Sequence, residues 1–256
     1  MSFETSRYIN ESVSNDTIKS LDFFIRNGLL YFIKIIKRHS PSNKNQTPQM
    51  SNPMSLMRNT ILSHAKKIKI NKGGIIYFKD NDSEESLCYM LISGVISMLK
   101  RSDNMIVLTF SDDFLLGDVH SVYYSSQYYL EAEVDSEILA IPSKDLSQVF
   151  TTQKHWEELT VNNAKILSRF FLRDEILLQD NSYAIIRSLI PIIMVLPDTV
   201  RNNCTLSSLI QKRVKISRSN VMRILAHLKA NNYITLNKGR LISAKILPDN
   251  MKIPLN

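Results

Sequence analysis

A short polar run in the last quarter of the chain has side chains that can form hydrogen bonds with nucleic-acid bases. The run is Ser217-Arg218-Ser219-Asn220, and Arg223 follows about one helical turn later. Arginine can hold O6 and N7 of guanine with two parallel hydrogen bonds, and asparagine can hold N6 and N7 of adenine in the same way. We therefore predict that Arg218, Ser219, Asn220 and Arg223 contact bases.

Two predicted helices position this run. The apolar spacing predicts a short helix over 206–212, a turn over 213–216 and a second helix over 218–230. Ser217 is a typical N-cap, because its hydroxyl can accept a hydrogen bond from an amide of the first helical turn. Seven apolar residues are expected to close a small core: Leu206, Leu209, Ile210, Val221, Ile224, Leu225 and Leu228. In helix-turn-helix proteins, the N-terminal end of such a second helix enters the major groove.

A hairpin with a basic tip is predicted next. Residues 233–236 and 241–244 have strand patterns, and residues 237–240 join them with Gly239 at the tip. Lys238 and Arg240 would lie against backbone phosphates. Lys215 in the turn and Ser217 at the helix N-terminus are the other residues predicted to contact phosphate.

The charge is uneven along the chain. Basic residues outnumber acidic ones by 8 to 4 in residues 1–58 and by 12 to 2 in residues 183–256, whereas residues 59–182 have 12 basic and 18 acidic residues. An acidic middle joined to a basic end is typical of a regulatory domain attached to a phosphate-binding one. Chance clustering of charge is the alternative.

The remaining composition fits a folded chain of one or two domains. It has 256 residues, of which 44% are hydrophobic. Cys88 and Cys204 lie far apart, which suits neither a disulfide framework nor a cysteine-based metal site. We find no signal peptide and no apolar run of about eighteen residues. We therefore expect a cytoplasmic protein without a membrane span.

The N-terminal part is predicted to be a helix followed by a linker. Apolar residues recur on one face over 17–38, and residues 40–53 contain three prolines and almost no apolar residues. We favour packing of this helix on the protein or on a second subunit. A helix lying on a membrane surface is the alternative.

The middle of the chain changes from short strands to helix. Short β-rich runs separated by turn residues over 68–141 predict an antiparallel barrel or sandwich. Residues 144–180 return to helical spacing, with a seam near heptad spacing that suits a dimer. The seam consists of Trp156, Leu159, Asn163, Ile166, Leu167, Phe170 and Leu177, and Asn163 could fix its register. A helix laid across its own barrel is the alternative.

This order of elements resembles the superfamily of the cyclic-AMP receptor protein and the fumarate–nitrate reduction regulator, which are homodimeric bacterial transcription factors. The resemblance covers residues 60–246 and is strongest at Ile216 to Leu225, which is similar to the family's recognition-helix signature. It implies an α+β chain with an N-terminal helix, a cyclic-nucleotide-binding-like β-barrel, a long dimerisation helix and a C-terminal winged helix-turn-helix. The expected parts are 1–39, a helical extension; 40–55, a linker; 56–150, the sensor barrel; 151–182, the dimerisation helix; and 183–256, the DNA-binding domain. Ser219 stands where the family often has glutamate, so a different DNA sequence is expected.

The sensor half departs from the family at its ligand site. Leu116-Gly117-Asp118 resembles the start of the family's phosphate-binding cassette, but no arginine occurs from Ser102 to Ser143 to neutralise a cyclic phosphate. The iron–sulfur cysteines of the oxygen-sensing branch are also missing. We predict no bound cyclic nucleotide, iron–sulfur cluster, haem or other cofactor. Four nearby residues that could suggest a metal are better explained by a solvated turn: Asp112, Asp113, Asp118 and His120.

The resulting prediction is a homodimeric, sequence-specific regulator that binds double-stranded DNA, with RNA polymerase as a further candidate partner. An interaction module, in which the winged helix and barrel dock on a protein, is the alternative. An enzyme is not expected, because the chain has no nucleophile elbow, HExxH motif, P-loop or dinucleotide-binding glycine pattern. The operator, the signal and the direction of regulation are not predicted.

Overall fold

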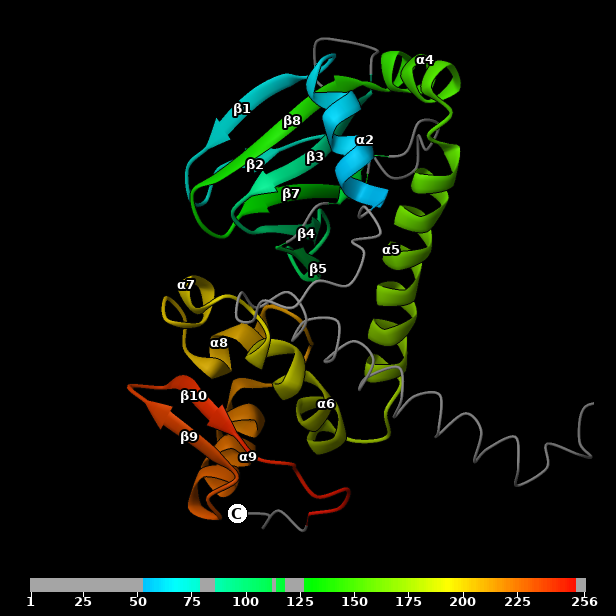
Figure 1. Ribbon diagram of the computed structural model, residues 1–256. Coiled ribbons are helices and arrows are strands. Elements are labelled where there is room, and N and C mark those ends of the chain that lie inside the picture. The colour runs from blue at the N-terminus through cyan, green and yellow to red at the C-terminus, as the bar shows by residue number, and fades with distance from the viewer. Residues whose placement is uncertain (1–52, 79–85, 112–113, 118–126, 252–256) are drawn as a thin grey trace, which may run out of the picture. The chain divides into compact units, whose positions relative to one another are not determined.

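The computed structural model describes residues 53–78, 86–111, 114–117 and 127–251 (Figure 1). The predicted N-terminal helix, most of the linker and the four polar residues considered for a metal lie outside these ranges. Helix α2 begins at Pro53, inside the stretch predicted as linker. No helix among the described residues is long and apolar enough to cross a membrane.

The first part of the described chain is a β-barrel made of two antiparallel four-stranded sheets. One sheet has the order β1-β8-β3-β6 and the other has the order β2-β7-β4-β5. The strands are β1 Lys66–Ile70, β2 Ile75–Ile76, β3 Leu87–Ser93, β4 Ile96–Lys100, β5 Ile106–Phe110, β6 Leu115–Leu116, β7 Tyr128–Ala132 and β8 Ser136–Pro142. The predicted barrel or sandwich is therefore confirmed.

The strands β3, β6 and β8 of the first sheet are buried on both faces, which explains their nearly continuous apolar sequences. In β8, Ile138 and Ala140 join the cluster between the two sheets, whereas Leu139 and Ile141 join a second cluster on the outer face. Successive side chains of a strand point to opposite faces, so one strand supplies both cores. Three helices cover the outer face: α2 Pro53–Leu62, α4 Ser143–Gln153 and the start of α5 Trp156–Leu177.

The helical stretch predicted over 144–180 is interrupted. Helix α4 ends at Gln153, and Lys154 adopts a left-handed conformation with a φ of 60° before α5 begins. Asn162 then ties α5 to the barrel, because its amide donates to the carbonyl of Leu115 at 3.0 Å and accepts from the amide of Leu115 at 3.1 Å. Its fully buried side chain thus extends the hydrogen bonding of β6.

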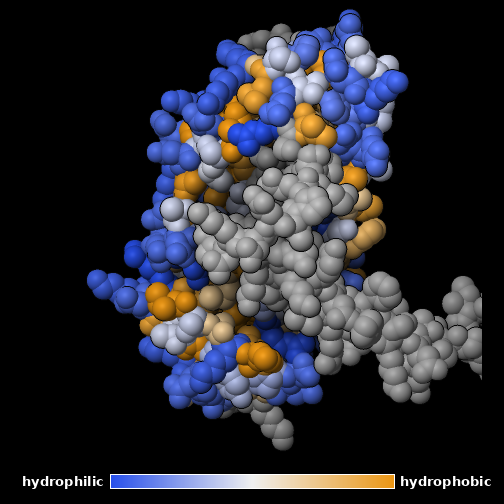
Figure 2. All heavy atoms as spheres, in the orientation of Figure 1, coloured by the Kyte–Doolittle hydropathy of each residue, from blue (hydrophilic) through white to orange (hydrophobic). Residues whose placement is uncertain are grey.

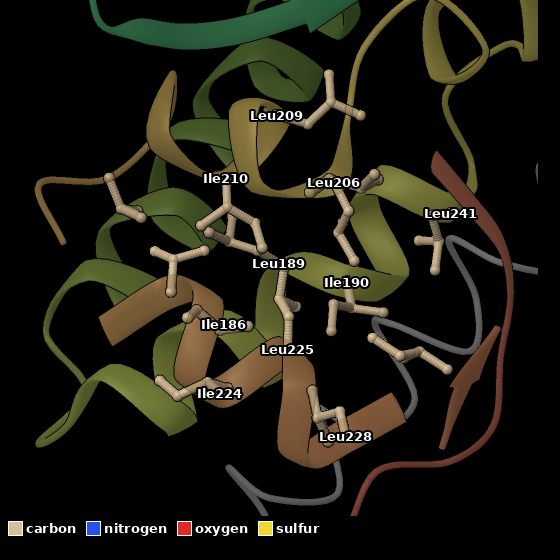
Figure 3. Close-up of a cluster of buried hydrophobic side chains, with 14 of the residues drawn as sticks. Ile186, Leu189, Ile190, Leu206, Leu209, Ile210, Ile224, Leu225, Leu228 and Leu241 are labelled. Carbon is tan, nitrogen blue, oxygen red and sulfur yellow. The ribbon is translucent and has the colours of Figure 1, made fainter. Parts of the chain in front are cut away.

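The C-terminal part is a winged helix-turn-helix. It contains α6 Ser182–Met194, α7 Asp198–Arg201, α8 Leu206–Gln211, α9 Arg218–Ala230, β9 Ile234–Asn237 and β10 Arg240–Ala244. Figure 3 shows side chains from α6, α8, α9 and β10 converging in one core. All seven residues predicted for this core are buried in it. Helices α8 and α9 also match the predicted helices closely, and the α+β fold class is confirmed.

Candidate nucleic-acid interface

The N-terminal turn of α9 forms as predicted. Ser217 is the N-cap, and its hydroxyl accepts a hydrogen bond from the amide of Asn220 at 3.4 Å. Arg218 and Ser219 are exposed beside it, and Met222 follows on the outer face with 49% of its surface exposed. The positive end of a helix with two exposed polar side chains suits contact with phosphate and base edges.

The predicted base reader Asn220 points elsewhere. Its side-chain nitrogen donates to the hydroxyl of Ser182 at 2.9 Å, and its oxygen accepts from Arg223 at 2.8 Å. The residue is half-buried, and both ends of its amide are bonded to other side chains of the domain. The prediction that it lies on the outer face with Arg218 is therefore corrected. The reason is that the Asn220 amide is hydrogen-bonded to Ser182 of α6. No sequence signal identified Ser182.

The predicted wing is present and is held on the helix-turn-helix. Lys238 and Gly239 form its two-residue turn, both with positive φ, at 49° and 79°. The carbonyl of Gly239 accepts a hydrogen bond from the amide of Leu206 at 2.8 Å, which attaches the turn to the start of α8. Lys238 and Arg240 are exposed on either side of this attachment. They are therefore available for the predicted phosphate contacts.

The turn between α8 and α9 carries a contact that sequence reasoning missed. Lys215, a predicted phosphate contact, lies with its ammonium 2.9 Å from the carboxylate of Asp103, in the turn between β4 and β5. The hydrogen bond from Lys215 is the main cause that lowers the pKa of Asp103. The amide of Ile106 also donates to the carbonyl of Lys212 at 2.8 Å. Asp103 lies among the turn residues that separate the predicted strands over 68–141, and nothing in the sequence pairs it with Lys215.

Arg213 is a structural arginine rather than a candidate DNA contact. Only 8% of its surface is exposed, and it donates to the carbonyl of Leu209 at 2.9 Å and to the hydroxyl of Thr109 at 3.2 Å. Burial lowers the pKa of its guanidinium. Basic composition alone did not distinguish this side chain from its exposed neighbours Lys212 and Lys215.

The seam predicted along α5 combines two faces of the helix. Leu159 is buried in the cluster beneath α2 and α4, Ile166 and Phe170 pack on the barrel core, and Leu177 packs on the winged-helix core. Leu159 is buried within the chain, which corrects its place in the seam, whereas Ile166, Phe170 and Leu177 are half-buried and their place in a dimer seam stays a prediction. The contacts of Leu159, Ile166 and Phe170 are those expected for the alternative of a helix laid across its own barrel. Heptad spacing could not separate the two faces, because the apolar arc spans both.

The other residues of the predicted seam lie on an exposed face of α5. Trp156, Asn163 and Leu167 are exposed there, and Phe171 and Leu178 extend the same face. Phe171 is 62% exposed and Leu178 is 75% exposed. In Figure 2, apolar patches interrupt the hydrophilic surface on the side along which α5 runs. This α5 stripe, formed by these five residues, is a largely apolar surface that the rest of the described chain leaves exposed.

The stretch that resembles the family's phosphate-binding cassette begins at Leu116-Gly117-Asp118. Only its start lies among the described residues. Gly117 has a φ of 88°, and a Cβ atom there would lie 2.7 Å from the carbonyl oxygen of Leu87, so the position requires glycine. Asp118 lies outside the described residues. The space between the two sheets is occupied by bulky buried side chains, among them Phe78, Met98 and Phe110.

Solved structures with similar folds include bacterial regulators. The c-di-GMP-responsive global regulator CLP of Xanthomonas campestris matches with a TM-score of 0.61 and 15% identity, over 75% of this chain and 99% of that one. A CooA variant from Carboxydothermus hydrogenoformans matches with a TM-score of 0.58 and 13% identity, over 77% of this chain and 94% of that one. A CRP/FNR-family transcriptional regulator from Thermus thermophilus matches with a TM-score of 0.54 and 13% identity, over 71% and 94%. The chain has the fold of the CRP/FNR regulators, as the resemblance implied.

One family model and relatives of higher sequence identity also match this chain. Residues 182–249 match the family described as winged helix-turn-helix DNA binding. The inhibitor of hydrogen peroxide resistance of Salmonella typhimurium LT2 is 29% identical over 171 residues, which are 65% of this chain and 81% of that protein. The protein of the same name from Escherichia coli K12 is 26% identical over 179 residues, which are 70% of this chain and 85% of that protein.

Proposed function

We propose that this chain is a transcriptional regulator of the CRP/FNR family that binds specific sequences of double-stranded DNA in the cytoplasm. In this proposal it is a regulator rather than an enzyme. The proposal rests mainly on one observation: the capped N-terminus of α9 presents Arg218 and Ser219 to solvent, with Arg223 held beside them. Arg218 and Arg223 read bases, Ser219 contributes a weaker contact, and the cap donates to phosphate.

The charge of the domain supports DNA as the partner. Residues 183–256 have 12 basic and only 2 acidic residues. Both acidic side chains are paired within the domain, Asp198 with Arg201 and Asp249 with Arg187. Neither acid is therefore paired with the basic residues of α9 or the wing. A winged helix that docks on protein does not need so basic a recognition face.

Selection from a random pool of DNA duplexes tests the proposal. The full-length protein should enrich one sequence, and its affinity for that sequence should fall steeply as salt rises, because bound phosphates release counterions. The matched control is the double variant Arg218→Ala, Arg223→Ala, whose fold is checked by circular dichroism and which should enrich no sequence. Absence of any enriched sequence, or an affinity that does not depend on salt, would favour the alternative of a protein-docking module.

We propose that the regulator acts as a homodimer through the α5 stripe. Leu167, Phe171 and Leu178 are large apolar side chains left exposed on one helix face. Such a stripe on a long helix suits pairing with the same stripe of a second copy. Two recognition helices would then meet two half-sites about one helical turn apart, so a palindromic operator is expected. Contact with RNA polymerase stays a further proposal.

The relatives suggest the process that is regulated. Two of them carry the name inhibitor of hydrogen peroxide resistance. We infer that this chain also lowers resistance to peroxide, by controlling genes that protect against it. Deletion of its gene should raise survival after a peroxide challenge, and the Arg223→Ala gene should not restore the sensitivity that the wild-type gene restores. Equal survival of the deletion and wild-type strains would contradict this role.

The barrel is proposed to act without a cyclic nucleotide. The stretch from Ser102 to Ser143 has neither arginine nor lysine to neutralise a cyclic phosphate. An anionic phosphate without a cationic partner is poorly held in a buried site. Calorimetric titration with cyclic AMP or cyclic GMP should therefore give no binding heat at physiological concentrations.

A further inference from the structure

The side chains of Ser182, Asn220 and Arg223 form a partly buried series of hydrogen bonds between α6 and α9 of the winged helix. The Asn220 nitrogen donates to the Ser182 hydroxyl at 2.9 Å, and its oxygen accepts from a terminal nitrogen of Arg223 at 2.8 Å. A guanidinium has only donors, so the Asn220 oxygen must be the atom that faces Arg223. Its nitrogen then faces Ser182. The chemistry of the three groups thus determines the orientation of the amide.

We propose that Asn220 is a positioning residue, which holds the Arg223 guanidinium ready for base contact and anchors it on Ser182. This inference rests on the proposed DNA-binding function. A guanidinium is planar, so one hydrogen bond from a terminal nitrogen restricts the orientation of the whole group. A side chain that is ordered before binding loses less conformational entropy when it meets its base. Asn220 therefore contributes to base discrimination without touching DNA.

The hydrogen bond from Asn220 to Ser182 also links Arg223 to the start of helix α6. Ser182 is the first residue of α6, directly after the N-cap Asn181, whose side chain accepts from the amide of Ala184 at 2.9 Å. The segment 178–181 joins this start of α6 to the end of α5. The position of the Arg223 guanidinium is thus tied to the point at which the long helix enters the DNA-binding domain. A shift of α6 relative to α9 would move Asn220 and, with it, Arg223.

Discrimination at a single base pair tests the proposal. The base pair that Arg223 reads is first identified as the operator position where Arg223→Ala loses its preference. The ratio of dissociation constants for the operator and for a duplex altered at that pair is then measured for each variant. Asn220→Ala removes two hydrogen bonds and should reduce this ratio about fivefold. Ser182→Ala removes one and should reduce it about twofold. The ratio at the pair read by Arg218 should not change.

Two matched variants separate positioning from general loss of stability. Asn231→Ala removes an amide at the other end of α9, where it donates to the carbonyl of His227 at 2.9 Å. Ser188→Ala removes a hydroxyl of α6 that accepts a bond from Gln179 at 2.9 Å. Neither residue takes part in the hydrogen bonds that link Ser182, Asn220 and Arg223, so both variants should keep the wild-type ratio. The slope of affinity against salt should also be unchanged in Asn220→Ala, because no phosphate contact is lost.

A double-mutant cycle gives the decisive comparison. In an Arg223→Ala background, Asn220→Ala should cause no further loss at the tested base pair, because its effect passes through Arg223. Equal losses at every base pair, or an unchanged ratio in both Asn220→Ala and Ser182→Ala, would overturn the inference. If the wild-type protein itself shows no preference among sequences, the proposed function fails instead. The two failures are therefore distinguishable.

Discussion

The ammonium of Lys215 lies 2.9 Å from the carboxylate of Asp103, so an acid of the barrel pairs with a lysine of the helix-turn-helix. The lysine side chain is 76% exposed and the aspartate side chain is 24% exposed. An exposed pair of this kind stabilises the fold only slightly. Its larger consequence concerns DNA, because a phosphate would compete with Asp103 for the same ammonium. The pair therefore opposes the phosphate contact that we predict for Lys215.

Removal of the acid should raise the affinity for DNA. In Asp103→Asn, Lys215 loses its carboxylate partner, whereas the oxygen that accepts from the amide of Met105 at 3.2 Å is kept. We expect affinity for all duplexes at low salt to increase about twofold to fivefold, within the range of exposed ion pairs. Asp135→Asn makes the same change in net charge in another turn of the barrel and is the control. Equal gains in the two variants would show that net charge, rather than release of Lys215, is responsible.

The same pair predicts a pH dependence of stability. The pKa of Asp103 is lowered chiefly by the hydrogen bond from Lys215. A carboxyl with a lowered pKa in the folded state stabilises the fold above its unfolded pKa of about 3.9, and this contribution is lost as the pH falls through the folded pKa. Wild type should exceed Asp103→Asn in free energy of unfolding by at most about 1 kcal/mol at pH 7. Urea titrations should show this difference shrinking below about pH 4; a difference that grows in acid would contradict the ion pair.

Loss of Arg223 should weaken recognition of one sequence. Arg223→Ala removes a guanidinium that can form two hydrogen bonds with guanine, and should cost about 1–3 kcal/mol of specific binding. Binding to random DNA should change much less. The measurement is a competition between the selected operator and random duplex. Unchanged discrimination between them would contradict the assigned base contact.

Loss of Lys238 should weaken binding to all DNA sequences equally. The wing presents this lysine to solvent beside the turn attached to α8, where it can meet phosphate but is not predicted to read a base. Lys238→Ala should lower the affinity for operator and random duplex by the same factor. The slope of log affinity against log salt should become shallower by about one unit. A loss confined to the operator would be inconsistent with a phosphate contact.

A charge within the α5 stripe should separate the proposed dimer. Phe171 is 62% exposed in the single chain, so Phe171→Glu should not disturb the barrel but should bury a carboxylate between two copies. Analytical ultracentrifugation should show a monomer at concentrations where wild type is a dimer. Lys165→Glu places an acid on the same helix, outside the stripe, and should stay dimeric. A wild-type monomer, or a Phe171→Glu dimer, would contradict the proposed surface.

The winged helix was predictable because its signals are local. Ser217 caps a helix that begins at the next residue, and the apolar spacing of α8 and α9 specifies which side chains meet. The wing follows from two strand patterns around Gly239. In each case the residues that determine the structure lie in one continuous stretch of the chain, between Thr205 and Ala244.

The remaining features depend on partners that are distant in sequence. Asn220 turns inward because Ser182 lies beside it, and Arg213 is buried because Thr109 of the barrel meets it. In the same way, Asn162 is buried rather than its neighbour Asn163, because the backbone of Leu115 accepts and donates there. Periodicity predicts that α5 has an apolar arc, but only the folded barrel determines which side of that arc is covered.

The central claim is that the exposed end of α9 reads a DNA sequence. Its most direct test is the ratio of dissociation constants of the full-length protein for its selected operator and for a duplex with the same composition in shuffled order. At about 0.15 M salt this ratio should be at least about a thousandfold in favour of the operator. Equal dissociation constants for the two duplexes would contradict the claim.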